Sequence, residues 1–234
     1  MPHLVLNAVS LTYPNGGVGL HPTTLDVPDG DRLALFGATG SGKTTLLRLI
    51  VGLESPTSGD ILLDGRRLND VPPHERGIAF IAQKPALYPH LTVEENLKLV
   101  TKVMAKAIAL LKIEHLLKRL PHQLSGGERQ RVVLARTVLK NAKVWLLDEP
   151  FAPLDPAFRL EFRKELHLLF ESLDATIILV SHDPIDALAL GRRLGVLGDG
   201  RLLRLGSAEE LRGHPGVTEA AATTGQFFFD SSAS

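Results

Sequence analysis

The sequence has 234 residues, of which 26 are basic and 26 acidic; 44% are hydrophobic and none is cysteine. This length allows one or two globular domains, and the composition argues against a disordered or fibrous chain. The lack of cysteine excludes disulfides, thiol catalysis and cysteine-ligated metals, and the zero net charge gives no indication of nucleic-acid binding.

The N-terminus and the apolar stretches bear on location. Residues 1–4 lack the basic start and apolar core of a signal peptide. No apolar run approaches the roughly 18 residues that are needed to cross a bilayer. These features alone predict a cytoplasmic protein that does not span a membrane.

The first third of the chain is expected to contain short strands and one helix. Residues 4–11 and the turn cluster at 13–17 predict strands, and Arg32–Phe36 predicts a strand that runs into a glycine-rich loop. The following apolar positions fall on one side of a helix: Leu46, Leu47, Leu49 and Ile50. Further short strands are expected at 61–63 and 77–81.

Residues 92–120 differ in character from what precedes them. They are rich in Leu, Ala, Glu and Lys and contain neither Pro nor Gly, which is a helical composition. Lys98, Lys102 and Lys106 recur every four residues, which predicts one helical face. A solvated face is favoured over a contact with anionic lipid.

The remaining elements complete an alternation of strands and helices. Helices should start near Ser125 and at Pro156, and 144–147 and 176–180 are fully apolar strands, as expected for a parallel sheet covered on both faces. Residues 193–205 predict a hairpin. This alternation indicates an α/β fold.

These patterns also predict a domain organisation. We expect one domain at 1–212, with a helical subdomain inserted at about 91–124, and a C-terminal tail at 213–234. The tail contains Phe227, Phe228 and Phe229. Such a segment is expected to pack on its own domain or stay disordered, with docking on a partner as the less favoured interpretation.

Residues 37–44 match the phosphate-binding pattern G-x-x-x-x-G-K-[ST], with an apolar strand before it and a helix after it. Its glycines let backbone N–H groups curl around an anion, and the helix N-terminus adds positive potential. Lys43 is expected to reach the β- and γ-phosphates, and the Thr44 hydroxyl to ligate Mg²⁺. The predicted nucleotide-binding residues here are Gly37, Ala38, Thr39, Gly40, Ser41, Gly42, Lys43, Thr44 and Thr45.

Two carboxylates, Asp148 and Glu149, follow the apolar strand at 144–147. A buried acidic pair is costly unless it serves a cation or a proton. Asp148 suits the Mg²⁺ shell, and Glu149 suits orienting and deprotonating an attacking water. An ordinary acidic turn is the alternative, and the phosphate loop makes it less favoured.

His182 follows the strand at 176–180. Because ligands bind beyond the carboxyl ends of strands in an open parallel sheet, Lys43, Glu149 and His182 are expected to meet at one edge. There His182 is expected to hydrogen-bond a γ-phosphate. Taken alone, it would more often be a structural residue, and the other eight histidines show no metal-ligand spacing.

Ser125 and Glu128 have the spacing of a capping box. A well-capped helix is the simple interpretation. However, Gly126 and Gly127 directly inside the helix start cost helical stability and expose backbone N–H groups at a positive terminus. This makes a second phosphate-recognition surface. One chain cannot easily apply both surfaces to one nucleotide, which suggests that two chains share it.

Together these motifs resemble the ATP-binding subunit of ATP-binding cassette (ABC) transporters. The segment from Leu124 to Glu128 reads as that family's signature, and the resemblance covers roughly residues 3–212. It implies a P-loop NTPase core with a mainly parallel sheet, an N-terminal antiparallel β subdomain and an inserted helical subdomain. ATP and Mg²⁺ are the implied ligands. The resemblance also implies a head-to-tail dimer, in which Ser125, Gly126 and Gly127 contact the γ-phosphate held by the partner chain.

Three further residues match positions of this family. Gln83 matches the glutamine loop, which touches Mg²⁺ or the attacking water and senses the membrane partner. Tyr13 lies where the family places an aromatic ring that stacks on adenine. Asp155 matches the loop that crosses the dimer interface, and a helix N-cap is an equally supported, compatible role. The sequence departs from the family at Ala152-Pro153, usually Ser-Ala, so coupling between the two sites could differ.

The resemblance predicts an ATPase subunit that drives transport at the cytoplasmic face of the cell membrane. Separate integral membrane subunits, on other chains, would carry the solute. Residues 73–93 resemble bacterial importers of small solutes, and this chain is expected to lack room for the C-terminal regulatory domain that such importers often carry. The alternative is a soluble ABC-type ATPase acting on DNA or ribosomes. The long coiled coils or duplicated cassette of those relatives are missing here, and no nucleic acid is expected.

Overall fold

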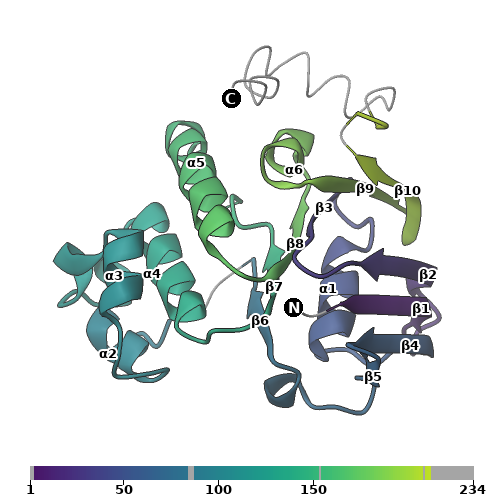
Figure 1. The fold of residues 1–234 in the computed structure, drawn as a ribbon, viewed down its shortest axis with the longest axis horizontal. Coiled ribbons are helices and arrows are strands. Elements are labelled where there is room, and N and C mark those ends of the chain that lie inside the picture. The colour runs from purple at the N-terminus through teal and green to yellow at the C-terminus, as the bar shows by residue number, and fades with distance from the viewer. Residues whose placement is uncertain (1–2, 84–86, 153, 208, 212–234) are drawn as a thin grey trace.

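Two β-sheets organise the part of the chain that the structure, a computed structural model, describes: residues 3–83, 87–152, 154–207 and 209–211 (Figure 1). The first sheet is antiparallel and has the order β2-β1-β4-β5. Its strands are β1 (Leu4–Thr12), β2 (Val18–Val27), β4 (Ser58–Leu63) and β5 (Arg66–Arg67). The predicted N-terminal antiparallel subdomain is therefore confirmed.

The second sheet has six strands in the order β10-β9-β3-β8-β7-β6. They are β3 (Arg32–Phe36), β6 (Ile78–Ile81), β7 (Val144–Asp148), β8 (Thr176–Ser181), β9 (Arg193–Gly198) and β10 (Arg201–Ser207). All neighbours pair in parallel except β9 and β10. These two form the predicted hairpin, whose turn residues Asp199 and Gly200 both have positive φ, as tight hairpin turns require.

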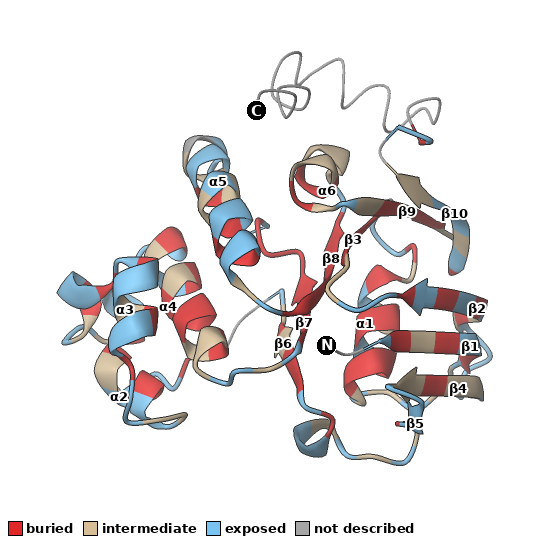
Figure 2. Ribbon diagram, viewed as in Figure 1, coloured by how far each residue is buried: buried red, intermediate tan, exposed pale blue. Residues whose placement is uncertain are grey.

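The six-stranded sheet separates two hydrophobic cores. Val144 and Leu146 of β7 face one core, which also contains α1 (Lys43–Val51) and the antiparallel sheet. Trp145 and Leu147 face the other core, which the remaining helices line. The central strands are buried on both faces (Figure 2), which is why they are apolar without alternation.

The described residues contain five further α-helices. They are α2 (Val93–Lys98), α3 (Ala105–Leu111), α4 (Gly126–Val138), α5 (Pro156–Ser172) and α6 (Pro184–Leu190). Short 3-10 turns lie at Pro73–Glu75, Glu114–Leu116 and Pro121–Gln123. We refer to α2, α3 and α4, which lie together in Figure 1, as the helical arm. The helical composition of 92–120 thus corresponds to helices, whereas α6 was not predicted.

The prediction of one lysine face on a single helix is wrong. Helix α2 ends at Lys98 and α3 begins at Ala105, so Lys102 lies in the connection between them. Lys98 is one turn from Glu94, and their side chains are 2.5 Å apart. The even spacing along the sequence therefore does not produce a stripe.

No helix among the described residues is long and apolar enough to cross a membrane. The predicted tail at 213–234, with its three phenylalanines, lies outside the described residues, and so does Pro153 of the unusual interface loop.

Candidate nucleotide site

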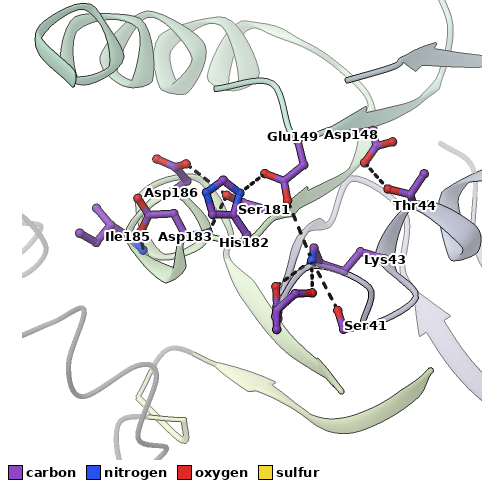
Figure 3. Close-up of polar contacts among 12 residues, drawn as sticks. Ser41, Lys43, Thr44, Asp148, Glu149, Ser181, His182, Asp183, Ile185 and Asp186 are labelled. Carbon is purple, nitrogen blue, oxygen red and sulfur yellow. Dashed lines mark hydrogen bonds and ion pairs between the residues drawn. The ribbon is translucent and has the colours of Figure 1, made fainter. Parts of the chain in front are cut away.

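Three neighbouring parallel strands bring the predicted chemical groups to one edge of the sheet (Figure 3). Strand β3 lies beside β8, and β8 lies beside β7. Lys43 follows β3 through the glycine-rich loop, Glu149 follows β7, and His182 follows β8. The prediction that these three side chains meet at the carboxyl edge is confirmed.

The glycine-rich loop at 37–42 folds tightly against its surroundings. A Cβ on Gly37 would lie 2.1 Å from the carbonyl oxygen of Leu197, so only glycine allows the loop to pass β9. Gly42 has a φ of 96° and precedes the first residue of α1. The loop therefore delivers the N-terminus of α1, with its free backbone N–H groups, to the edge of the sheet.

Lys43 is held inside the loop that it closes. Its Nζ donates to the carbonyl oxygens of Gly37 at 2.7 Å and Ala38 at 2.9 Å. The side chain is 5% exposed, and this burial lowers its pKa, although Glu149 and Asp148 oppose the shift. The ammonium group thus occupies the concave side of the loop, where a phosphate would be bound.

Thr44 and Asp148 form a pair of oxygen donors. The Thr44 hydroxyl donates to Asp148 Oδ1 at 2.9 Å. Burial raises the pKa of Asp148, and the hydrogen bond from Thr44 opposes that shift. Gln83 is exposed and lies two residues after β6, whose Ile81 pairs with Leu147 of β7, so it belongs to the same edge. Oxygen donors of this kind suit Mg²⁺, which usually keeps waters and phosphate oxygens in its shell.

Glu149 lies between His182 and Lys43. Its Oε2 is 2.7 Å from Nδ1 of His182, and its Oε1 is 3.9 Å from Nζ of Lys43. An ionised carboxylate only accepts, so Nδ1 carries the proton in this contact and Nε2 is left for another partner. Glu149 is 8% exposed and has a φ of 49°, a left-handed backbone that is strained for a residue with a Cβ.

Tyr13 lies beside the start of α1. Its hydroxyl is 3.3 Å from the hydroxyl of Thr45, and its ring packs over Gly19, where a Cβ would approach it to 2.7 Å. The ring therefore lies next to the phosphate loop, a position compatible with the predicted contact with a base. Stacking on adenine stays a prediction.

The signature residues lie away from this edge. Ser125 caps α4, and its hydroxyl accepts from the backbone N–H of Glu128 at 3.2 Å while its own N–H donates to the Glu128 carboxylate at 2.8 Å. The predicted capping box is confirmed. Helix α4 belongs to the helical arm and to one core, whereas the helix that follows the phosphate loop belongs to the other. The structure thus does not bring the two phosphate-recognition surfaces of one chain together.

Asp155 caps α5, and its carboxylate accepts from the backbone N–H of Phe158 at 3.0 Å. The N-cap role is therefore confirmed, and the dimer-interface role stays a prediction.

Gly127 has a packing role that the sequence did not indicate. A Cβ at this position would lie 2.2 Å from the Phe158 ring of α5. We expect Gly127→Ala to lower the free energy of unfolding by about 1–3 kcal/mol through overpacking, measured by urea denaturation. In Phe158→Ala the same substitution should cost much less. Equal costs in both backgrounds would contradict the contact.

A family model described as "ABC transporter" matches residues 20–152. This chain belongs to the ABC transporter family. The resemblance inferred from the motifs is therefore confirmed, and so is the fold class, because solved cassettes of the family have the same fold.

Two curated members of the family are similar over most of the chain. An uncharacterized ABC transporter ATP-binding protein, YurJ of Bacillus subtilis, is 44% identical over 82% of this chain and 55% of its own length. The sn-glycerol-3-phosphate import ATP-binding protein UgpC of Roseobacter denitrificans is 37% identical over 96% of this chain and 66% of its own. The chain thus spans between half and two thirds of these relatives.

A solved structure of the family shows a nucleotide-bound dimer. The ATP-binding cassette MJ0796, described as the dimeric post-hydrolysis state bound to ADP and Pi, superposes with a TM-score of 0.77. It is 29% identical, and the match covers 87% of this chain and 98% of MJ0796.

Proposed function

We propose that this chain is the ATP-hydrolysing subunit of an ABC importer. The observation that carries the proposal is the meeting of Lys43, the Thr44–Asp148 pair and the Glu149–His182 pair at one edge of the sheet. Each group matches one requirement of phosphoryl transfer: a cation for the phosphates, oxygen donors for a metal, and a base for water.

We propose the following roles for these residues in hydrolysis. The γ-phosphate competes with the loop carbonyls for the ammonium of Lys43. With Nδ1 donating to Glu149, a doubly protonated His182 would also donate from Nε2 to a γ-phosphate oxygen. Glu149 accepts a proton from water while the water oxygen attacks the γ-phosphorus. The bond between the γ-phosphorus and the bridging oxygen of ADP breaks in line with this attack. Mg²⁺ held by Thr44 and Asp148, with Gln83 nearby, would neutralise charge on the phosphates. The products are ADP and inorganic phosphate.

A second copy of the chain is proposed to complete each site. Ser125 directly precedes α4, which contains Gly126 and Gly127 and packs into a different hydrophobic core from α1, the helix that follows the phosphate loop. In a head-to-tail dimer these three residues would reach the γ-phosphate of the partner, with Asp155 at the interface. The dimeric state of the MJ0796 cassette supports this arrangement.

The proposals for the membrane partner and for the direction of transport are based on the names of similar proteins. UgpC proteins are named as import ATP-binding proteins, which favours import. We propose that integral membrane permease subunits bind this chain at the cytoplasmic face of the membrane. A soluble ATPase acting on DNA or ribosomes is not favoured, because the matched relatives carry transporter names.

Copurification tests the transport role. The tagged chain, expressed in its own host and extracted with mild detergent, is expected to bring down an integral membrane protein that mass spectrometry identifies. Salt-sensitive copurification with ribosomes or DNA instead of a membrane protein would contradict the proposal.

Metal dependence tests the ATPase role. Chelation of Mg²⁺ is expected to stop phosphate release, and Asp148→Asn to raise the Mg²⁺ concentration for half-maximal turnover by roughly tenfold or more, because one charged donor is lost. Asp174→Asn, which removes an exposed carboxylate that pairs with Lys143, is the matched control and should change nothing. Release that is indifferent to Mg²⁺ would contradict the assignment of Thr44 and Asp148.

A further inference from the structure

A buried carboxylate, Asp186, lies next to the turn that carries His182 (Figure 3). It is 0% exposed. Oδ1 accepts from Arg163 Nε at 3.0 Å and Nη2 at 2.6 Å, and Oδ2 accepts from Arg159 Nη2 at 2.8 Å and from the Ser181 hydroxyl at 3.1 Å. A buried charge is costly even when paired, and the proposed chemistry does not use this carboxylate. Its arrangement therefore requires another explanation.

The turn is attached to Asp186 on one side of His182 and to Arg159, a partner of Asp186, on the other. On one side, the Ser181 hydroxyl that donates to Asp186 also accepts from the backbone N–H of Asp183 at 3.1 Å. On the other side, Arg159 Nη1 is 3.3 Å from the Asp183 carboxylate. His182 thus lies between two residues, Ser181 and Asp183, that both contact the same cluster of charged side chains.

The same guanidinium groups also reach the loop that follows Glu149. Phe151 is buried two residues after Glu149, and the guanidinium carbons of Arg159 and Arg163 lie 5.8 and 5.9 Å from the centre of its ring. Both arginines project from α5, one helical turn apart, so they contact the two loops from a single rigid element. Helix α5 therefore spans the two loops that carry Glu149 and His182.

We propose that Arg159, Arg163, Ser181 and Asp186 form a positioning cluster that holds His182 against Glu149. None of the four touches the reacting atoms, and they act by setting the 2.7 Å separation between the imidazole and the carboxylate. The inference rests on the proposed function, because it assigns the cluster to the geometry of ATP hydrolysis. In such a pair, displacements of about 1 Å are enough to slow chemistry strongly.

Ser181→Ala is the sharpest test, because it removes the hydroxyl that joins Asp186 to the turn and leaves both ion pairs in place. We expect kcat for ATP hydrolysis to fall roughly tenfold, with KM changed less than about twofold, since the phosphate loop is untouched. Ser181→Thr, which restores a hydroxyl, is expected to recover most of the lost turnover.

Glu171→Gln provides the matched control for stability. Glu171 lies near the far end of α5 and pairs with the buried guanidinium of Arg32, so its loss is expected to lower Tm without reaching His182. Turnover measured well below both Tm values should remain at the wild-type level. Wild-type kcat in Ser181→Ala, or an equal loss of kcat in Glu171→Gln, would overturn the positioning role.

A second readout does not depend on hydrolysis. In ¹⁵N-labelled protein, the signal of a protonated His182 Nδ1 that donates to Glu149 is expected in wild type and should shift or broaden in Ser181→Ala. An unchanged signal overturns the proposal even if turnover falls. If wild type releases no phosphate but the signal depends on Ser181, the proposed function fails while the positioning role stands.

Discussion

Glu149→Gln is expected to lower ATP turnover about a thousandfold while leaving ATP affinity intact. The amide has nearly the same size and can still contact His182, but it cannot accept a proton from water. ATP should therefore bind and remain unhydrolysed, and the dimer should accumulate. Phosphate release, the affinity for a fluorescent ATP analogue, and size-exclusion chromatography with ATP measure the three effects.

The matched control for this substitution is Glu165→Gln. Glu165 lies on α5 and pairs with Arg131 at 2.7 Å, so the same change of charge occurs outside the candidate site. Turnover of the control is expected to stay near wild type. Unchanged turnover in Glu149→Gln would remove Glu149 as the base.

Ser125→Arg is expected to abolish turnover with little effect on the ATP affinity of the isolated chain. In the proposed dimer the long cationic side chain would fill the space for the partner's γ-phosphate, while the phosphate loop would keep all of its contacts. Because the substitution also removes an N-cap, worth about 1 kcal/mol, Thr92→Arg is the matched control. Thr92 caps α2 with the same capping box and should tolerate the change without loss of turnover.

Mixing two inactive variants tests the sharing of the site. Lys43→Ala is expected to be inactive because it removes the phosphate-binding ammonium, and it keeps an intact signature. Combined with Ser125→Arg, which keeps an intact phosphate loop, it should form heterodimers with one complete site, and turnover should return in the mixture. No recovery, or loss of ATP binding by monomeric Ser125→Arg, would show that the shared geometry is wrong.

The central sheet could be predicted closely from the sequence. Residues 33–36 are apolar throughout because both faces of the strand are covered, and β3 (Arg32–Phe36) contains them. Short elements could not be placed in the same way. Helix α6 has seven residues, too few for a periodic pattern, although Asp183 and Pro184 at its start are helix-start signals. The lysine spacing wrongly predicted a single helical face, because α2 ends at Lys98.

The residues at the edge of the sheet were predictable because their motifs are local. Lys43 lies within a contiguous pattern, and Glu149 and His182 each directly follow an apolar strand. The contacts that surround them are not local. Asp186 is paired with residues 23 and 27 positions earlier, and nothing in the sequence distinguishes a buried aspartate from an exposed one on a short helix. The packing of Phe158 over Gly127 likewise joins residues far apart in the sequence and could not be predicted from it.

The left-handed backbone at Glu149 sets stability and activity against each other at one position. Glycine or asparagine adopts this conformation more readily, so either should relieve the backbone strain at this position. A library of this chain screened for heat resistance alone is therefore expected to enrich inactive sequences at position 149. Only a screen that also requires ATP turnover would keep the glutamate. Retention of glutamate at position 149 would then indicate selection for activity and not for stability.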